Sequence, residues 1–177
     1  MPRDGGGSSS ADVRFQSEVL GPHHDLGSFA SGVVSLDDWL RSAAPHASAM
    51  NTGRTFVWHS GGDVVVAYFT LAAHLVRRDR VAKKVGRGSP DDIPSVLLAR
   101  LALSQEGHGD GLGGELLWDA LSRAVAASTI AAARLVVVEA LDENAARFYE
   151  HHGFVAAPDR PFVLVQKVSD IAVALGS

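Results

Sequence analysis

The stretch Gln-Glu-Gly-His-Gly-Asp-Gly-Leu-Gly-Gly, residues 105–114, joins an apolar run to an amphipathic pattern. The run before it, residues 96–103, has the length and composition of a mostly buried strand. After it, apolar side chains recur at the three- and four-residue spacing of a helix, from Leu112 to Val125. A strand-to-helix turn directs unpaired backbone N–H groups and the positive end of the helix dipole at one point. The stretch therefore predicts a loop that binds a pyrophosphate.

Glycines let this backbone approach a ligand closely and take positive φ, and they stand at positions 107, 109, 111, 113 and 114. A dinucleotide-binding motif fits three of them, but the preceding chain is too long for a first strand, and no acid follows at the ribose-binding spacing. A P-loop requires a lysine, which the stretch lacks. A flexible turn without a ligand remains the simpler alternative.

Length and composition predict one globular domain. The chain has 177 residues, of which 46% are hydrophobic, which suits a single well-packed core. We expect this domain to span residues 13–177, after a Gly/Ser leader at residues 1–12 that cannot bury a core and should be disordered. The net charge of -4 gives no overall nucleic-acid signature, so an anionic partner would have to meet a local patch.

Nothing in the sequence predicts an exported or membrane protein. The chain has no cysteine and therefore no disulfide framework. Its apolar runs are too short to span a bilayer, and its N-terminus lacks the apolar centre of a signal peptide. We therefore expect a cytoplasmic location and no membrane partner.

The order of elements predicts an α/β protein with a mixed sheet flanked by helices on both faces. We expect a strand at 15–20, a helix at 36–44, a hairpin of 55–59 and 64–71, a strand at 96–103, a helix after the glycine stretch, a strand at 133–140, a helix at 143–152, a strand at 162–167 and a terminal helix at 168–175. Ser35 and Asp38 have capping-box spacing, and Pro45 should stop the first helix. Asp142 should cap the helix that Gly153 closes.

A basic segment lies between the hairpin and the strand at 96–103. Within residues 77–94 it carries six cations, which are Arg77, Arg78, Arg80, Lys83, Lys84 and Arg87. Such a concentration stands out in a chain of net negative charge. A solvated loop or helix face explains a charge run equally well, so a binding role needs further support.

Two motifs resemble those of the GNAT N-acetyltransferases. The first is the acetyl-CoA signature Gln/Arg-x-x-Gly-x-Gly/Ala, matched by Gly111 and Gly113, with His108 as a departure at the first position. The second is the helix pattern of residues 144–154, in which Asn144, Phe148, Tyr149, Gly153 and Phe154 are in place. The resemblance implies the GNAT fold, in which two central parallel strands splay apart and acetyl-CoA lies between them.

A narrower resemblance covers most of the chain. Segments 36–41, 51–57, 67–72 and 98–102 look like those of the GNAT-type toxins of bacterial type II toxin–antitoxin pairs. The resemblance implies acetylation of the amino group of aminoacyl-tRNA, inhibition of translation, a ribbon-helix-helix antitoxin and a possible homodimer. It also makes the basic segment a candidate tRNA contact.

The same resemblance assigns candidate roles to individual residues. Tyr149 becomes the candidate general acid that protonates the departing thiolate, although a buried aromatic is the alternative interpretation. Asn144 would either bind the cofactor or cap its own helix. The candidate acetyl-CoA contacts are Leu101, Leu103, His108, Gly109, Gly111, Leu112, Gly113, Gly114 and Asn144.

Other chemistries find little support in the sequence. The chain has eight histidines, but the adjacent pairs at 23–24 and 151–152 lack metal-ligand spacing, so we expect no metal site. No general base is evident. Two alternatives to the toxin hypothesis remain: an N-acetyltransferase for a protein N-terminus, lysine or small amine, and a non-catalytic module that binds acetyl-CoA.

Overall fold

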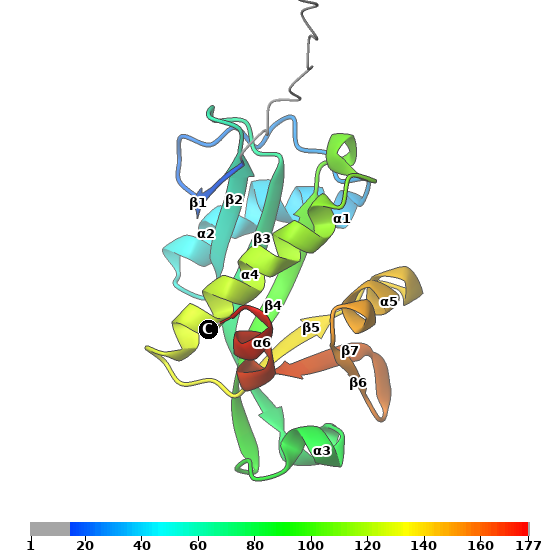
Figure 1. The fold of residues 1–177 in the computed structure, drawn as a ribbon. Coiled ribbons are helices and arrows are strands. Elements are labelled where there is room, and N and C mark those ends of the chain that lie inside the picture. Colours follow the sequence, from blue (N-terminus) through cyan, green and yellow to red (C-terminus); the bar gives the residue numbers. More distant parts are fainter. Residues whose placement is uncertain (1–14, 177) are drawn as a thin grey trace, which may run out of the picture.

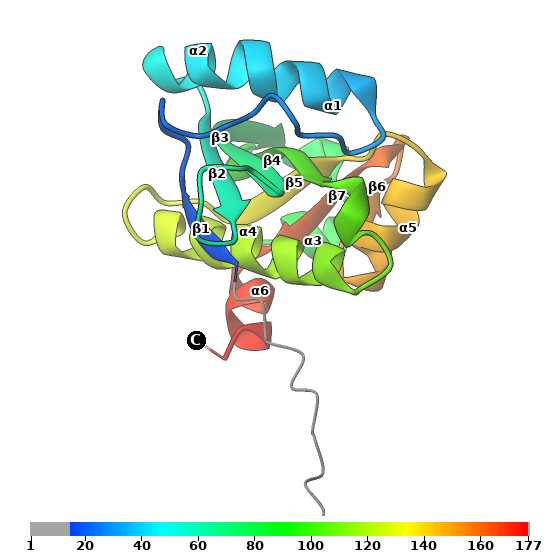
Figure 2. The same ribbon diagram turned by 90° about the horizontal axis from the view of Figure 1, so that it is seen from above.

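The computed structural model describes residues 15–176. The expected Gly/Ser leader at residues 1–12 lies outside the described residues. The chain forms one seven-stranded mixed sheet with helices on both faces, which confirms the expected fold class (Figures 1 and 2). The strands are β1 (Gln16–Val19), β2 (Arg54–His59), β3 (Ala67–Arg77), β4 (Asp92–Leu103), β5 (Leu135–Glu139), β6 (Val155–Ala157) and β7 (Arg160–Lys167).

The strand order is β1-β2-β3-β4-β5-β7-β6, and every neighbouring pair is antiparallel except β4 and β5. β4 and β5 are parallel because the helix between them carries the chain back across the sheet. Strand β6 was not expected from the sequence. Its three residues form an edge beside β7, which is too short a run to show a periodic pattern.

The helices divide between the two faces (Figure 2). They are α1 (Val34–Asp38), the π-helical turn η1 (Trp39–Ala43), α2 (Ala44–Ala49), the short 3-10 turns η2 (Arg78–Arg80) and η3 (Gln105–Gly107), α3 (Lys83–Gly86), α4 (Leu112–Ser128), α5 (Glu143–His151) and α6 (Val168–Ala174). Alternate residues of the strands face α1–α2 on one side and α4 on the other, as Val57 and Trp58 illustrate. No helix in the described part of the chain is long and apolar enough to cross a bilayer.

The first helical region is longer than expected. It runs from Val34 to Ala49 without a break, and Pro45 lies in the first turn of α2 rather than ending the helix. The preceding π-helical turn widens the hydrogen-bond pattern, and a proline is tolerated in a first turn because its missing N–H is not needed there. The predicted capping box at Ser35 is wrong: Val33 is the N-cap, and no side chain caps this helix.

The ends of α5 lie where the local sequence predicts them. The carboxylate of Asp142 accepts a hydrogen bond from the Ala145 N–H at 2.8 Å, which confirms the expected N-cap. Gly153 closes the helix with a φ of 96°. A Cβ at this position would lie 2.8 Å from Nε2 of Gln166, so both backbone conformation and space favour glycine.

We expect Gly153→Ala to lower the free energy of unfolding by about 1–2 kcal/mol, because an L-residue is strained in the left-handed region. Urea denaturation monitored by circular dichroism measures the change. Gly62→Ala is the matched control, since a Cβ there meets nothing within 4 Å and its φ is not in the left-handed region. Equal stability of the two variants would contradict the role assigned to Gly153.

Candidate active site

The central parallel strands separate part-way along β4. β4 pairs with β5 only through residues 95–98. The register of β4 against β3 then shifts, so that Ala99 is an extra residue between Leu98 and Arg100. Such a β-bulge bends a strand and interrupts its pairing. Residues 99–103 therefore continue beside β3 while their other edge is unpaired, which matches the expected splay (Figure 1).

The unpaired edge of β4 presents the backbone of two predicted site residues. The Ser104 N–H donates to the Val66 carbonyl at 2.8 Å, so even-numbered residues in this part of β4 bond toward β3. Leu101 and Leu103 have the opposite parity, and their N–H and C=O groups face the gap beyond the end of the β4–β5 ladder. Both groups of Leu101 and the N–H of Leu103 are open to a ligand that lies along the strand, whereas the Leu103 carbonyl already accepts a hydrogen bond from His108.

The glycine stretch follows directly and ends at the start of α4. Positive φ is confined to Gly109 (89°) and Gly111 (74°), whereas Gly113 and Gly114 lie in the first turn of the helix. Gly111 is the N-cap, and no side chain caps α4. The first backbone N–H groups of a 17-residue helix are therefore available to an anion. The strand-to-helix turn has the geometry that the sequence predicts, and its binding of a pyrophosphate stays a prediction.

His108 contacts the end of the preceding strand. Its Nε2 lies 2.8 Å from the Leu103 carbonyl oxygen, so this nitrogen donates the hydrogen bond. The ring therefore ties the exposed loop back to the end of β4. The structure thus supplies a contact through which His108 shapes the loop.

Helix α5 brings the second motif against the first. A Cβ at Gly113 would lie 3.8 Å from the Phe148 ring, and one at Gly114 would lie 3.4 Å from the His152 ring. The two motifs, far apart in the sequence, thus meet where α4 begins, as expected for parallel strands joined by a crossover helix. Burial, followed by the charge of His151, lowers the pKa of His152, which favours its neutral form.

Tyr149 is buried in α5, with 8% of its surface exposed. Its ring packs edge-to-face on Phe154 and Phe148, with centroids 5.6 and 5.3 Å away. Burial raises the pKa of Tyr149 to about 12, so the hydroxyl keeps its proton at neutral pH. Among the described residues its hydroxyl has no hydrogen-bond partner, and it is therefore free to donate to a ligand.

Asn144 lies exposed near the start of α5, and its Oδ1 accepts a hydrogen bond from Arg147 at 3.2 Å. The capping role that the sequence left open belongs to Asp142 instead. Asn144 therefore remains a candidate cofactor contact.

The basic segment forms the tip of a long hairpin rather than a loop inserted between separate elements. Pairing of β3 with β4 extends to Arg77 opposite Asp92, and α3 is anchored through the buried Val81 and Val85 (Figure 1). β4 spans 12 residues, so the tip lies about 36 Å from the glycine loop at about 3.3 Å per residue. The structure thus does not bring the basic residues next to the predicted cofactor residues.

The six cations of the tip are not equivalent. Arg77 pairs with Asp79 and Asp92 at 3.5 and 3.7 Å, while Arg78 pairs with Asp91 at 2.7 Å and donates to the Ser89 carbonyl at 2.8 Å. These two arginines therefore hold the tip together. Within residues 15–176, no ion pair is formed by the remaining exposed cations, Arg80, Lys83, Lys84 and Arg87. Of these four, Lys83 and Arg87 line a groove of about 800 Å³.

An aromatic–cation stack beside the bulge was not predicted from the sequence. The Arg100 guanidinium lies 5.1 Å from the centroid of the Trp39 ring, which stacks on Tyr68 at 6.1 Å. The Tyr68 hydroxyl donates to the Leu36 carbonyl at 2.6 Å. This stack fixes the first helical region against β4 on the face opposite α4. The feature of the sequence that could have indicated this stack is Arg100 itself, a charged residue within an apolar strand.

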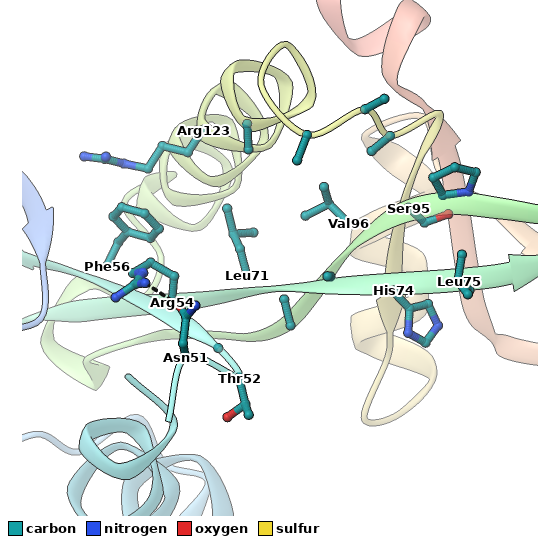
Figure 3. A pocket seen from close by; sticks show the side chains of 18 residues that line it. Asn51, Thr52, Arg54, Phe56, Leu71, His74, Leu75, Ser95, Val96 and Arg123 are labelled. Atoms are coloured by element: carbon teal, nitrogen blue, oxygen red, sulfur yellow. Dashed lines mark hydrogen bonds between the residues drawn. The ribbon is translucent and has the colours of Figure 1, made fainter. Parts of the chain in front are cut away.

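A hollow of about 1020 Å³ opens at the other end of α4 (Figure 3). It lies between strands β2–β4 and the C-terminal half of the helix, and its lining includes Arg54, Phe56, Leu71, His74, Leu75, Val96 and Arg123. None of the predicted cofactor residues lines it. A search for the functional site by cavity volume alone would therefore select this hollow rather than the glycine loop and the unpaired edge of β4.

Comparison with known proteins decides the family. The chain is 37% identical over 152 residues to the tRNA-acetylating toxin of Mycobacterium tuberculosis, which covers 86% of this chain and 91% of that protein. The chain belongs to the GNAT-type toxins. No protein-family model matches the chain.

Solved structures of GNAT-type toxins have the same fold. A tyrosine-to-phenylalanine variant of KacT superposes with a TM-score of 0.84 at 23% identity, covering 90% of this chain and 98% of that one. AtaT complexed with acetyl-methionyl-tRNAfMet gives a TM-score of 0.83 at 25% identity, covering 91% and 99%. A tyrosine-to-phenylalanine variant of AtaT bound to acetyl-CoA and the C-terminus of the antitoxin AtaR gives 0.79 at 24% identity, covering 92% and 99%.

We expect the stability contributed by Tyr149 to be fully present below about pH 10 and to be lost as the pH rises through the folded-state pKa of about 12. The free energy of unfolding falls with rising pH because burial favours the neutral phenol, whereas the phenol of the unfolded chain ionises at about pH 10. The shift of about two pH units corresponds to about 2–3 kcal/mol. Urea denaturation at a series of pH values from about 9 upward measures the slope.

Tyr149→Phe is the control for this titration, because phenylalanine keeps the ring and cannot ionise. The difference between the two proteins isolates Tyr149 from the lysines that titrate in the same range. Parallel pH profiles for wild type and variant would show that this phenol is not buried in solution.

Proposed function

We propose that the chain transfers the acetyl group of acetyl-CoA to the α-amino group of aminoacyl-tRNA. The observation that carries this proposal is the 37% identity to a tRNA-acetylating toxin over nearly the whole chain. The unpaired edge of β4 beside an uncapped helix start supports it, because these two features suit a long thioester cofactor with a pyrophosphate.

In this proposal the cofactor is held mainly by backbone groups. The N–H groups at the start of α4 and the loop amides of Gly109 and Gly111 bind the pyrophosphate. The N–H and C=O groups of Leu101 and the N–H of Leu103 pair with the amide groups of the pantetheine arm, while the Leu103 carbonyl stays bonded to His108. A backbone N–H of this edge also polarises the thioester carbonyl and stabilises the oxyanion that forms on attack.

The reaction moves one acetyl group and one proton. The amine lone pair attacks the thioester carbon, the C–S bond breaks as the intermediate collapses, and the ammonium proton ends on the CoA sulfur. An α-amine has a pKa of about 8, so a useful fraction is neutral without a dedicated base.

Tyr149 serves this step as a hydrogen-bond donor and relay. Its pKa of about 12 is well above that of a thiol, about 8.5, so full ionisation of the phenol to protonate the thiolate is unfavourable. A hydroxyl that donates to the developing thiolate while it accepts the ammonium proton remains neutral throughout. The raised pKa fits this relay better than a separate acid step.

The acceptor must be large if it also contacts the basic tip. The free cations of the tip and the glycine loop stand at opposite ends of β4, about 36 Å apart. A small amine cannot reach both, whereas a tRNA can. The phosphates of such an acceptor would meet Arg80, Lys83, Lys84 and Arg87.

An antitoxin partner and a cytoplasmic site of action follow from the same proposal. A structure of the related AtaT includes the C-terminus of the antitoxin AtaR. Charged tRNA is a cytoplasmic substrate, so acetylation of it takes place there. A homodimer remains a prediction from the sequence resemblance.

Acetyl transfer from labelled acetyl-CoA tests the function directly. We expect label on aminoacylated tRNA and none on deacylated tRNA or on a panel of small amines and peptides. Tyr149→Phe should lower kcat by about 10²–10⁴-fold with little change in acetyl-CoA affinity, because only the proton relay is removed.

Label on peptides or small amines alone would move the function to the ordinary acetyltransferases of the superfamily. Cofactor binding without any transfer would favour the non-catalytic module. Full activity of Tyr149→Phe would remove the relay from the mechanism while leaving the acceptor assignment intact.

Charge reversal tests the tRNA contact. We expect Lys83→Glu/Lys84→Glu to raise the KM for aminoacyl-tRNA and to reduce the salt dependence of binding by a slope of about 1–2, since each lost phosphate contact contributes about 0.7–0.9. Filter binding across a salt series measures the slope. These lysines are exposed, whereas Arg77 and Arg78 form ion pairs that hold the tip together.

Arg54→Glu is the matched control, because Arg54 is an exposed cation at the start of β2, away from the tip. It should leave the salt slope unchanged. The double variant changes the net charge by twice as much as Arg54→Glu, so a control effect half as large as that of the double variant would mean that overall charge, and not the tip, governs binding.

A further inference from the structure

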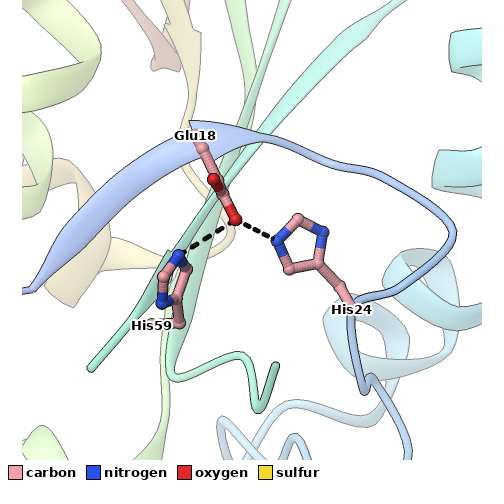
Figure 4. Close-up of side chains that lie close together, drawn as sticks. All are labelled: Glu18, His24 and His59. Atoms are coloured by element: carbon pink, nitrogen blue, oxygen red, sulfur yellow. Dashed lines mark hydrogen bonds and ion pairs between the residues drawn. The ribbon is translucent and has the colours of Figure 1, made fainter. Parts of the chain in front are cut away.

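Three side chains from separate segments converge at the β1 edge of the sheet (Figure 4). Glu18 lies in β1, His24 in the loop that follows, and His59 at the end of β2. Oε1 of Glu18 is 2.7 Å from Nε2 of His24 and 2.9 Å from Nε2 of His59. The three candidate ligand atoms all lie within 4.8 Å of one another.

Both imidazoles are buried, and one ring nitrogen lacks a partner. The His24 and His59 side chains are 0% and 8% exposed. Nε2 of His59 is close to the Glu18 carboxylate, but the contact is not aligned as a hydrogen bond, and this buried nitrogen has no other partner among the described residues. A buried polar atom left in this way is destabilising and is satisfied in most proteins by a protein group, a water or an ion.

We propose that Glu18, His24 and His59 bind a Zn²⁺ ion that fastens β1 and the following loop to β2. Zinc favours imidazole nitrogen and carboxylate oxygen at about 2.0–2.2 Å, which sets tetrahedral ligands about 3.3 Å apart. The two separations from Glu18, 2.7 and 2.9 Å, need to open by a few tenths of an ångström, and the two imidazole nitrogens, which lie within 4.8 Å of each other, need to close to the same spacing. The site stands apart from the acetyl-transfer chemistry and does not depend on it.

The ligand set has the charge and the fourth position that zinc requires. A glutamate carboxylate is ionised at neutral pH, so Glu18 supplies negative charge to the site. Nε2 of His23 lies 3.6 Å from the same carboxylate oxygen, and its side chain is 58% exposed. This ring, or a water, completes the tetrahedron.

Zinc binding moves a proton on each imidazole. Without metal, the Gly21 N–H donates to Nδ1 of His24 at 2.9 Å, and the Gly61 N–H donates to Nδ1 of His59 at 3.1 Å, so the ring protons are on Nε2. Ligation through Nε2 moves each proton to Nδ1. The Gly21 carbonyl, 3.3 Å from Nδ1 of His24, then accepts one of them.

The second proton requires the turn at Gly61 to shift, because its N–H would otherwise face a protonated Nδ1. Gly61 has a φ of 102° and open space around its Cβ position, so the turn has room to move. Zinc should therefore perturb the backbone amides of Gly21 and Gly61 in particular.

Sequence spacing could not predict this site. The expectation of no metal rested on the histidine pairs at 23–24 and 151–152, each considered by itself. The ligands instead become neighbours through the β1–β2 register, in which Gln16 lies opposite His59 and Glu18 opposite Val57.

The test uses full-length, tag-free protein that has been treated with a chelator and returned to buffer. Zn²⁺ is titrated by calorimetry and followed by ¹H–¹⁵N NMR. We expect one equivalent to bind, the amides of Gly21 and Gly61 to shift, and the midpoint of thermal unfolding to rise. Glu18→Gln and His59→Gln should each weaken binding by more than about 100-fold, beyond the effect usual for an outer-shell partner.

His46→Gln is the matched control, since His46 is an exposed histidine on α2 outside the cluster. It should bind zinc like the wild type. The proposal is overturned if zinc does not bind, if all variants bind equally, or if the amide shifts lie elsewhere. Should His59→Gln fail to fold, Glu18→Gln, with its side chain 44% exposed, and the wild-type amide shifts still decide.

Discussion

The interruption of hydrogen bonding between β4 and β5 is the constraint on which the candidate site depends. Pairing stops at Leu98 because the bulge at Ala99 bends β4 away from its parallel neighbour. A strand edge with unpaired backbone groups is usually unfavourable inside a protein. Here the edge lies beside the uncapped start of α4. A single extended ligand can therefore accept hydrogen bonds both from the N–H groups of the strand edge and from those of the first turn of the helix.

Features that depend only on residues close together in the sequence were predictable from it. Asp142 and Gly153 bound α5 as expected, because an N-cap and a left-handed closing glycine act within one helical turn. The glycine loop was found for the same reason. The failures were longer in range: Pro45 follows a π-helical turn that no local pattern announces, and the bulge at Ala99 carries neither glycine nor proline.

The candidate site was likewise only partly predictable. The two GNAT motifs identified the loop and α5, and the fold brings them together at Gly113 and Gly114. The sequence could not show that the basic residues stand at the far end of β4, or that Arg77 and Arg78 are engaged by nearby acids. A count of charges treats the six cations alike. Their ion pairs separate the two arginines that hold the tip together from the four cations that are available to bind an anion.

The same interruption has a mechanical consequence. Within residues 15–176, the half-sheet of β1–β4 is joined to that of β5–β7 by a ladder of only four residue pairs and by one further backbone hydrogen bond, from the Arg134 N–H to the Pro94 carbonyl. The sheet therefore resists bending least along the boundary between β4 and β5, where the strands are separated over part of their length. The two half-sheets can tilt about the short β4–β5 ladder as a hinge, while α4 connects them on one face. A ligand bound between β4 and β5 would stiffen the whole sheet.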